Sequence, residues 1–208
     1  MLSEPQWALI FGAAKKRGAR WPDLADVDAF KREVEGAFDI QAPAEGTRET
    51  RTPSGRQVSQ RGIDLMHQFE GCVLKAYKDP GSKDGLPITI GFGSTSDLDG
   101  NPIKLGTVWT KEQACAKFAQ DLQKFAAQVD KLIGSAPTDQ SQFDACVALA
   151  YNVGVGAFAK STVLRKHKAG DHAGAAAAFG MWVKNDGVTM RGLVRRRAAE
   201  AALYLADG

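Results

Sequence analysis

Cysteine and histidine are scarce in this sequence, with three residues of each. Cys72, Cys115 and Cys146 are far apart and no Cys-x-x-Cys pair occurs, so neither a disulfide framework nor a zinc site is predicted. Each cysteine falls in an apolar context, and we expect three buried free thiols. None of the histidines has the neighbouring ligands that a metal ion requires. A disulfide scaffold and a metalloenzyme are therefore not predicted.

Long apolar runs are also missing. The run near the N-terminus, residues 7–11, is far too short to cross a bilayer. The cationic residues within 15–20 follow this run, whereas a secretory signal places its positive charges first. The sequence therefore predicts no signal peptide and no transmembrane segment, and we expect the chain to be made in the cytoplasm.

Charge of the two signs is nearly balanced, with a formal net charge of +3. The excess lies near the C-terminus, where residues 160–208 carry nine basic and four acidic side chains. Such a region could meet nucleic acid or another anionic polymer, and charge alone does not choose between them. The hydrophobic share of 44% and the charged share of 25% are those of a folded globular protein.

Three segments are predicted along the chain. Residues 1–40 have apolar positions at helical spacing and are expected to form a small helical appendage. Residues 41–58 are rich in Pro, Gly, Ser, Thr and charge, with almost no apolar side chain, which is typical of a linker. Residues 59–208 contain the remaining periodic segments and are predicted to form the catalytic domain.

Most periodic segments of the main domain are helical. Helices are predicted at 59–70, at 110–134 behind a Thr110/Gln113 capping box, from about Thr138, and from about 193 to 206. Residues 74–79 and 88–93 instead alternate with a period of two and are predicted to form a hairpin. One small hairpin lobe among many helices indicates a mainly helical α+β fold.

The second predicted strand has an unusual distribution of side chains. Its apolar residues alternate with Thr89, Gly91 and Gly93, so the face that these three share would be almost bare backbone. Such a face suits a long polar ligand that lies close against it. The alternative is a tight bend that requires glycine, and the sequence leaves both interpretations open.

Two carboxyl groups, Glu70 and Asp79, lie on either side of the first strand in contrasting surroundings. Glu70 is predicted at a helix C-terminus beside apolar residues, and both features favour a protonated carboxyl group. Asp79 lies among lysines, which favour an ionised one. Glycoside hydrolysis requires such a pair. Most pairs at this spacing are solvated surface residues, so spacing alone does not identify an enzyme.

Motifs in a fixed order surround this pair. Glu70-Gly71 closes a helix, an aromatic-x-Asp follows at 77–79, and Thr-Ile-Gly-x-Gly stands at 89–93. Further motifs follow at 150–154 (AYNVG), 158–162 (FAKST) and 192–200 (GLVRRRAAE). With these motifs, residues 57–208 resemble the phage lysozyme family, glycoside hydrolase family 24, which contains the T4-lysozyme-like endolysins.

This resemblance implies a lysozyme-like fold and an N-acetylmuramidase. Such an enzyme cleaves the β-1,4 bond between N-acetylmuramic acid and N-acetylglucosamine and lyses the bacterial host cell wall. Glu70 would protonate the leaving oxygen, while Asp79 and Thr89 would hold and activate the attacking water. Family members of the T4 type invert configuration, so water rather than Asp79 is expected to attack the sugar. No metal or organic cofactor is implied.

The resemblance also indicates where substrate binds. Tyr151 and Asn152 fall where the family lines its glycan groove. Together with Gly91 and Gly93 they are the candidate substrate-binding residues. For Asn152 the alternative is an asparagine that simply satisfies a helix end.

The chain departs from the family's pattern at Ser94 and keeps the family's arginine run near the C-terminus. Many relatives have His after the Gly-x-Gly, where this chain has Ser94. Such a histidine would chiefly be a structural ion-pair partner, so its absence removes one expected salt bridge and leaves the catalytic assignment in place. At Arg195–Arg197 we expect packing and ion pairing with Glu200, and direct glycan or membrane contact is the alternative.

The implied partner is the peptidoglycan glycan strand, with wall or outer-membrane contact through the basic C-terminal region as a further option. No nucleic-acid partner is expected. We expect a monomer that reaches the wall from the host cytoplasm after holin-type release. Residues 1–56 match no family as clearly, and both a wall-docking role and a packing extension fit them.

Two other functions are compatible with parts of the pattern. A lytic transglycosylase also uses a catalytic glutamate but forms a 1,6-anhydro product without water. Asp79 and Thr89 argue against it, because that reaction has no water to position. A non-catalytic wall-binding or phage structural module could keep the fold, but retention of Glu70, Asp79 and Thr89 together argues against it.

Overall fold

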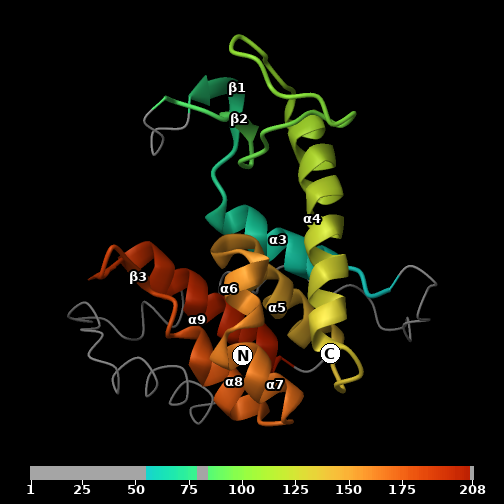
Figure 1. Ribbon diagram of the computed structural model, residues 1–208, viewed down its shortest axis with the longest axis vertical. Helices are drawn as coiled ribbons and strands as arrows, with labels where there is room; N and C mark the ends of the chain where they lie inside the picture. The colour runs from blue at the N-terminus through green and yellow to red at the C-terminus, as the bar shows by residue number, and fades with distance from the viewer. Residues whose placement is uncertain (1–54, 79–83, 207–208) are drawn as a thin grey trace. The chain divides into compact units, whose positions relative to one another are not determined.

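The computed structural model describes residues 55–78 and 84–206. The predicted helical appendage at 1–40 and most of the predicted linker lie outside these residues. The chain forms two compact units (Figure 1). The smaller unit spans Met66–Lys124, and the larger unit contains the described residues before and after it.

The smaller unit is built on an antiparallel hairpin. Strand β1 (Val73–Lys78) pairs with β2 (Ile88–Gly91), and a bulge interrupts their register. Residues 107–109 also pair with β1 through backbone hydrogen bonds. The predicted hairpin is confirmed, but the second strand ends at Gly91 rather than Gly93, because the chain turns there.

Two helices complete the smaller unit: α3 (Gln60–Phe69) ends in it, and α4 (Lys111–Ile133) begins in it. The predicted capping box of α4 is confirmed, since the Thr110 amide donates to the Gln113 side chain at 2.8 Å and the Gln113 amide donates to the Thr110 hydroxyl at 3.2 Å. The buried apolar side chains of this unit include Met66, Ile90, Phe92, Ala114, Phe118 and Leu122.

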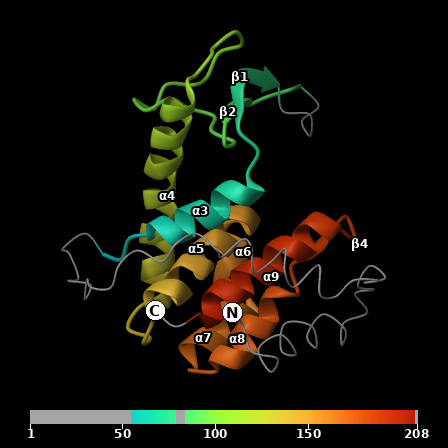
Figure 2. The ribbon, with the colours of Figure 1, turned by 180° about the vertical axis from the view of Figure 1, so that it is seen from behind.

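The larger unit is helical. Its helices after α4 are α5 (Gln140–Val153), α6 (Val155–Ala159), α7 (Thr162–Lys168), α8 (His172–Phe179) and α9 (Arg191–Leu205). Helix α5 packs against α9, and α8 packs against both α7 and α9, as both views show (Figures 1 and 2). Among the described residues, no helix is long and apolar enough to cross a membrane.

Helix α5 is the centre of this unit. Every residue from Phe143 to Ala150 is buried, so α5 is covered on all sides, unlike a surface helix with one apolar stripe. It begins at a capping box in which the Asp139 side chain accepts from the Gln142 amide and the Gln142 side chain accepts from the Asp139 amide. The start predicted near Thr138 is thus confirmed to within two residues.

A second, very short hairpin was not predicted. Strands β3 (Lys184–Asn185) and β4 (Val188–Thr189) are joined by Asp186 and Gly187, whose φ angles are +47° and +80°. Asp-Gly with positive φ at both residues is the preferred two-residue hairpin loop. The Asp-Gly dipeptide in the sequence therefore indicated a hairpin, although the flanking strands are too short to show the alternation of a strand.

Residues on either side of the predicted boundary at residue 59 contact helices of the larger unit. Arg56 pairs with Asp130 at 2.5 Å, and the Ser59 amide donates to the carboxylate of Asp144 at 2.9 Å. Arg56, in the segment predicted as the end of the linker, is thus ion-paired to α4, and the boundary at residue 59 stays a prediction. The linker composition concealed this because the contacts involve residues about 75 to 85 positions away in the chain.

Candidate functional site

Glu70 directly follows the last helical residue of α3, and its amide donates to the carbonyl of Met66 at 3.0 Å. The predicted position at a helix C-terminus is confirmed. Met66 is buried in the core of the smaller unit, while the Glu70 side chain is partly exposed. The carboxyl group is thus attached to a well-packed helix end and remains accessible to a ligand.

Thr89 is the second residue of β2 and lies opposite Tyr77 of β1. Its side chain is partly exposed, and its hydroxyl donates to the Pro87 carbonyl at 3.3 Å. A hydroxyl that donates one hydrogen bond still offers lone pairs to another donor. The strand therefore places the Thr89 hydroxyl, an accessible hydrogen-bond acceptor, two residues before the C-terminal end of β2.

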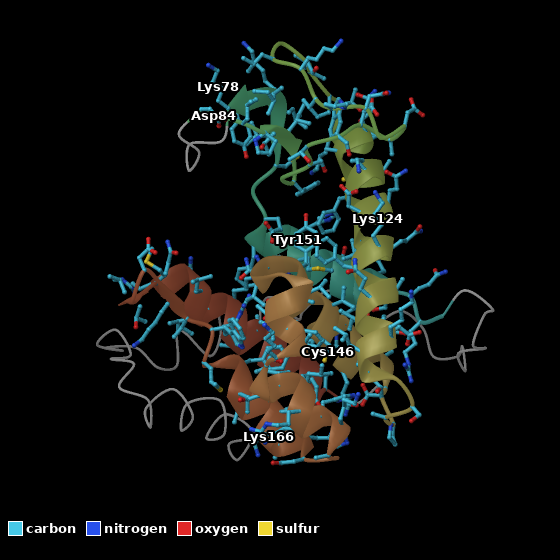
Figure 3. The ribbon with its side chains drawn as sticks, in the orientation of Figure 1. Lys78, Asp84, Lys124, Cys146, Tyr151 and Lys166 are labelled. Atoms are coloured by element: carbon cyan, nitrogen blue, oxygen red, sulfur yellow. The ribbon has the colours of Figure 1, made fainter. Side chains whose placement is uncertain are left out.

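The third predicted catalytic residue, Asp79, lies outside the described residues. Lys78 and Asp84 are the described residues on either side of its segment (Figure 3). Lys78 is the last residue of β1 and pairs with Ile88, the residue before Thr89. The separation of Asp79 from Glu70, which would distinguish inversion from retention, stays a prediction.

The two candidate glycines have different surroundings. A Cβ atom added at Gly91 would lie 3.1 Å from the Trp109 ring, so Gly91 is buried against a side chain. A Cβ atom at Gly93 would meet nothing within 4 Å, and Gly93 is exposed. The predicted shared bare face is therefore wrong for Gly91. The sequence did not reveal this because Trp109 reaches Gly91 only through tertiary packing.

A tight turn follows β2, which was the alternative that the sequence left open. The amides of Ile90 and Ser94 each donate to the other's carbonyl at 2.9 Å. Gly91 and Gly93 have φ of +65° and +98°, values that other residues adopt only with strain. The glycines are thus required by the turn, and contact of Gly93 with substrate stays a prediction.

Ser94 occupies the position where many family members have histidine, and it is not isolated. Its hydroxyl donates to Asp121 of α4 at 3.2 Å. The same carboxylate pairs with the buried side chain of Lys117. Ser94 thus makes a neutral hydrogen bond to α4, and Lys117 of the same helix provides the counter-charge of Asp121. The i, i+4 spacing of Lys117 and Asp121 on a predicted helix was the sequence signal for this ion pair.

Tyr151 and Asn152, the other predicted substrate contacts, lie in the last turn of α5 in the larger unit. Tyr151, labelled in Figure 3, is partly buried and packs its ring against Phe125 with centroids 5.0 Å apart. Asn152 is exposed. Gly154 follows with φ of +87° and ends the helix by donating to the Ala150 carbonyl. Contact of Tyr151 and Asn152 with glycan stays a prediction.

The arginine run of α9 is divided between the interior and the surface. Arg196 and Arg197 are buried, and both donate to the same oxygen of buried Glu200, at 3.0 and 2.7 Å. Arg195 is exposed. The predicted packing and ion pairing with Glu200 are confirmed. Contact of the basic C-terminal region with a wall or membrane stays a prediction, and these two buried arginines cannot contribute to it.

The cysteines only partly match their prediction as buried free thiols. Cys146 is fully buried in α5, but Cys115 is half-buried and Cys72 is exposed. The prediction is wrong for Cys72 because it lies between the end of α3 and β1, where the chain runs along the surface. Among the described residues, no group of three or more His, Cys, Asp or Glu side chains is arranged to hold a metal ion.

Comparison with known proteins gives one family throughout. The family model "Phage lysozyme" matches residues 67–200. An endolysin of Bacillus phage PZA is 44% identical over 148 residues, which cover 71% of this chain and 55% of that relative. The chain thus spans about half the length of that relative.

Two further matches cover nearly the whole of the other protein. An endolysin of Salmonella phage P22 is 39% identical over 149 residues, which are 72% of this chain and 98% of that relative. The solved muramidase domain of SpmX from Asticaccaulis excentricus is 32% identical, with a TM-score of 0.64, and the match covers 73% of this chain and 100% of that domain.

Proposed function

The chain belongs to the phage lysozyme family, and from this membership we propose that it is an endolysin that hydrolyses bacterial peptidoglycan. The bond cleaved would be the β-1,4 bond between N-acetylmuramic acid and N-acetylglucosamine. The observation that carries the proposal is the placement of Glu70 at the end of α3, in the same compact unit as the hairpin that holds Thr89.

In the proposed reaction, Glu70 donates a proton to the oxygen that leaves the sugar. Asp79 accepts a proton from water, and the Thr89 hydroxyl accepts a hydrogen bond from the same water. That water attacks the anomeric carbon from the opposite side of the ring, so the configuration inverts. The partial exposure of Glu70 and Thr89 leaves both groups within reach of a glycan chain. The reaction as written needs no metal and no organic cofactor.

Substrate binding is proposed at three accessible residues. Gly93 offers exposed backbone in the turn after β2, and the amide of Asn152 is exposed at the end of α5. Tyr151 offers a partly exposed ring of the kind that packs against sugar rings. Gly91 packs against Trp109, so we propose that it does not contact the glycan and only allows the turn that positions Gly93.

The test is clearing of purified cell wall by the full-length chain and by single variants. We expect Glu70→Gln to abolish clearing, and Asp79→Asn and Thr89→Ala to reduce it strongly. Glu112→Gln, which neutralises an exposed glutamate of the same unit, is the matched control and should clear like the wild type. Equal clearing by Glu70→Gln and the wild type, or none by either, would refute the proposal.

Mass analysis of the released fragments identifies both the bond and the reaction. Hydrolysis leaves reducing N-acetylmuramic acid ends, whereas a lytic transglycosylase leaves 1,6-anhydro ends. Anhydro ends together with an unaffected Asp79→Asn variant would show that the chain is a transglycosylase.

We further propose that the enzyme acts as a monomer after holin-type release from the host cytoplasm. Light scattering of the purified full-length chain tests the first point. For the second, expression in a bacterial host should lyse cells only when a membrane-permeabilising protein is co-expressed. Lysis by the chain alone would show that it reaches the wall by another route.

A further inference from the structure

Three aromatic rings from three segments meet in the smaller unit. His67 lies in the last turn of α3, Phe92 in the turn after β2, and Phe118 on α4. The rings of His67 and Phe92 stack, with centroids 4.5 Å apart and an interplanar angle of 16°. Phe118 lies 4.7 Å from His67 and 5.1 Å from Phe92, tilted against both. We call these three residues the ring cluster.

The ring cluster is connected through the chain to both described catalytic candidates. His67 precedes Glu70 by three positions, a spacing that places the two on one side of the helix end. Phe92 follows Thr89 by three positions, at the centre of the turn that ends the strand. A tilt of the α3 end would move Glu70, and a shift of the turn would move the end of β2.

Two backbone hydrogen bonds between Ile90 and Ser94 close the turn, but its glycine backbone is permissive, so side-chain contacts also limit its position. Gly91 and Gly93 stand on either side of Phe92, and glycine restricts backbone rotation least of all residues. Phe92 is only 6% exposed, and the His67 ring lies face to face on it. The stack therefore limits the positions that the turn can adopt relative to the end of α3.

We infer that His67 is a positioning residue, whose ring holds the Glu70 end of α3 against the turn that follows Thr89. The inference rests on the proposed function for the roles of Glu70 and Thr89. A flat ring at position 67 is what the geometry requires, because only a planar side chain can stack face to face on Phe92. Proton transfer by the imidazole is not part of the role.

Loss of the ring should affect turnover more than binding. A misplacement of about 1 Å can lower a rate about 100-fold, so we expect His67→Ala to lower kcat by about 10- to 100-fold. We expect KM to stay within about threefold, because the residues proposed to bind glycan are untouched. His67→Phe keeps a flat ring and should retain kcat within about threefold, with the pH profile of the wild type.

The kinetic experiment uses the full-length chain and solubilised, uncrosslinked glycan strands. The wild type and Glu70→Gln are measured first and establish whether the chain hydrolyses this substrate. His67→Ala and His67→Phe follow, with Gln60→Ala as the matched control at the exposed first residue of α3. If His67→Ala does not fold, His67→Leu replaces it, because leucine fills the space without stacking.

Amide hydrogen exchange at Ser94 provides a readout that does not depend on activity. The Ser94 amide donates to the Ile90 carbonyl across the turn, so its exchange rate reports opening of the turn. We expect His67→Ala to speed this exchange by about five- to tenfold, whereas His67→Phe should leave it unchanged.

Each outcome bears on one of the two proposals. A His67→Ala enzyme with wild-type kcat, unchanged exchange at Ser94, or a His67→Phe enzyme as slow as His67→Ala would overturn the role of the stack. A wild type that leaves glycan strands intact, or an active Glu70→Gln variant, would instead overturn the proposed function. In that case, exchange at Ser94 still decides whether the His67 ring holds the turn.

Discussion

The Tyr204 hydroxyl lies 2.7 Å from Nδ1 of His167 in the interior of the larger unit, where both side chains are only 1% exposed. The other ring nitrogen, Nε2, lies 2.8 Å from the hydroxyl of Thr138, which itself donates to the Ala136 carbonyl. Thr138 therefore accepts from Nε2–H of His167. The Tyr204 hydroxyl faces Nδ1 of His167 and also lies 3.1 Å from Nδ1 of His172. Both ring nitrogens of a neutral His167 thus have a hydrogen-bond partner in the protein interior.

Acid should therefore destabilise the protein through His167. Burial, with the charges of His172 and Arg56, lowers the pKa of His167 from 6.5 to about 4. Between these values the unfolded chain binds a proton that the folded chain does not, so the free energy of unfolding falls as the pH falls through this window. The contribution is fully present above pH 6.5 and should amount to about 3 kcal/mol.

Thermal unfolding of wild type and His167→Gln between pH 7 and pH 4.5 tests this prediction. The variant should be less stable at pH 7 but lose less stability on acidification. His172→Gln removes one of the charges that lower the pKa of His167, so it should lessen the pH dependence without abolishing it. Equal pH dependence for wild type and His167→Gln would contradict the prediction.

Asp121 should matter for stability because it balances a buried cation. Asp121→Asn leaves Lys117, which is 1% exposed, without its counter-charge, and we expect a loss of about 3 kcal/mol in urea unfolding. Ser94→Ala removes only a neutral donor and should cost about 1 kcal/mol. Lys124→Ala removes an exposed partner of the same carboxylate and should cost less than about 0.5 kcal/mol. Similar losses in all three variants would show that burial of Lys117 is not the cause.

Gly91 and Gly93 form a matched pair for separating backbone strain from packing. Alanine at either position must adopt a positive φ, which costs about 1–2 kcal/mol. Gly91→Ala would in addition press against the Trp109 ring, so its total loss should be about 2–4 kcal/mol. Equal losses would mean that the Trp109 ring moves aside.

If Gly93 contacts glycan, Gly93→Ala should also raise KM, whereas an unchanged KM would remove Gly93 from the binding site.

The three cysteines should react in the order of their exposure. Cys72 should be alkylated first by iodoacetamide in the native protein, then Cys115, and Cys146 only on unfolding. Partial desolvation and the neighbouring Cys115 raise the pKa of Cys72 despite Lys111, so its reaction should speed up as the pH rises through the alkaline range. Burial raises the pKa of Cys146 as well. Mass spectrometry of the peptides checks the order, and early labelling of Cys146 would contradict it.

Local signals were sufficient to predict most elements of the main domain. The capping pair Thr110/Gln113 and the glycine at 134 predicted α4 to within a residue at each end, because helix ends depend on hydrogen bonds between neighbours in the chain. The same holds for the position of Glu70 directly after α3. The ordered motifs indicated the family before any coordinates were considered.

The sequence by itself thus determined most elements of the main domain, the family and the position of Glu70 along the chain, since these depend on neighbouring residues and on motifs in a fixed order. Only the tertiary structure decided that Trp109 packs on Gly91, that Ser94 donates to Asp121 of α4, and that the ring of His67 stacks on Phe92. Trp109 and Gly91 are 18 positions apart, and His67 and Phe92 are 25 positions apart, so neither pair carries a local pairing signal. Their contacts arise when separate elements compete to bury the same apolar surface, and local patterns do not encode the outcome of that competition.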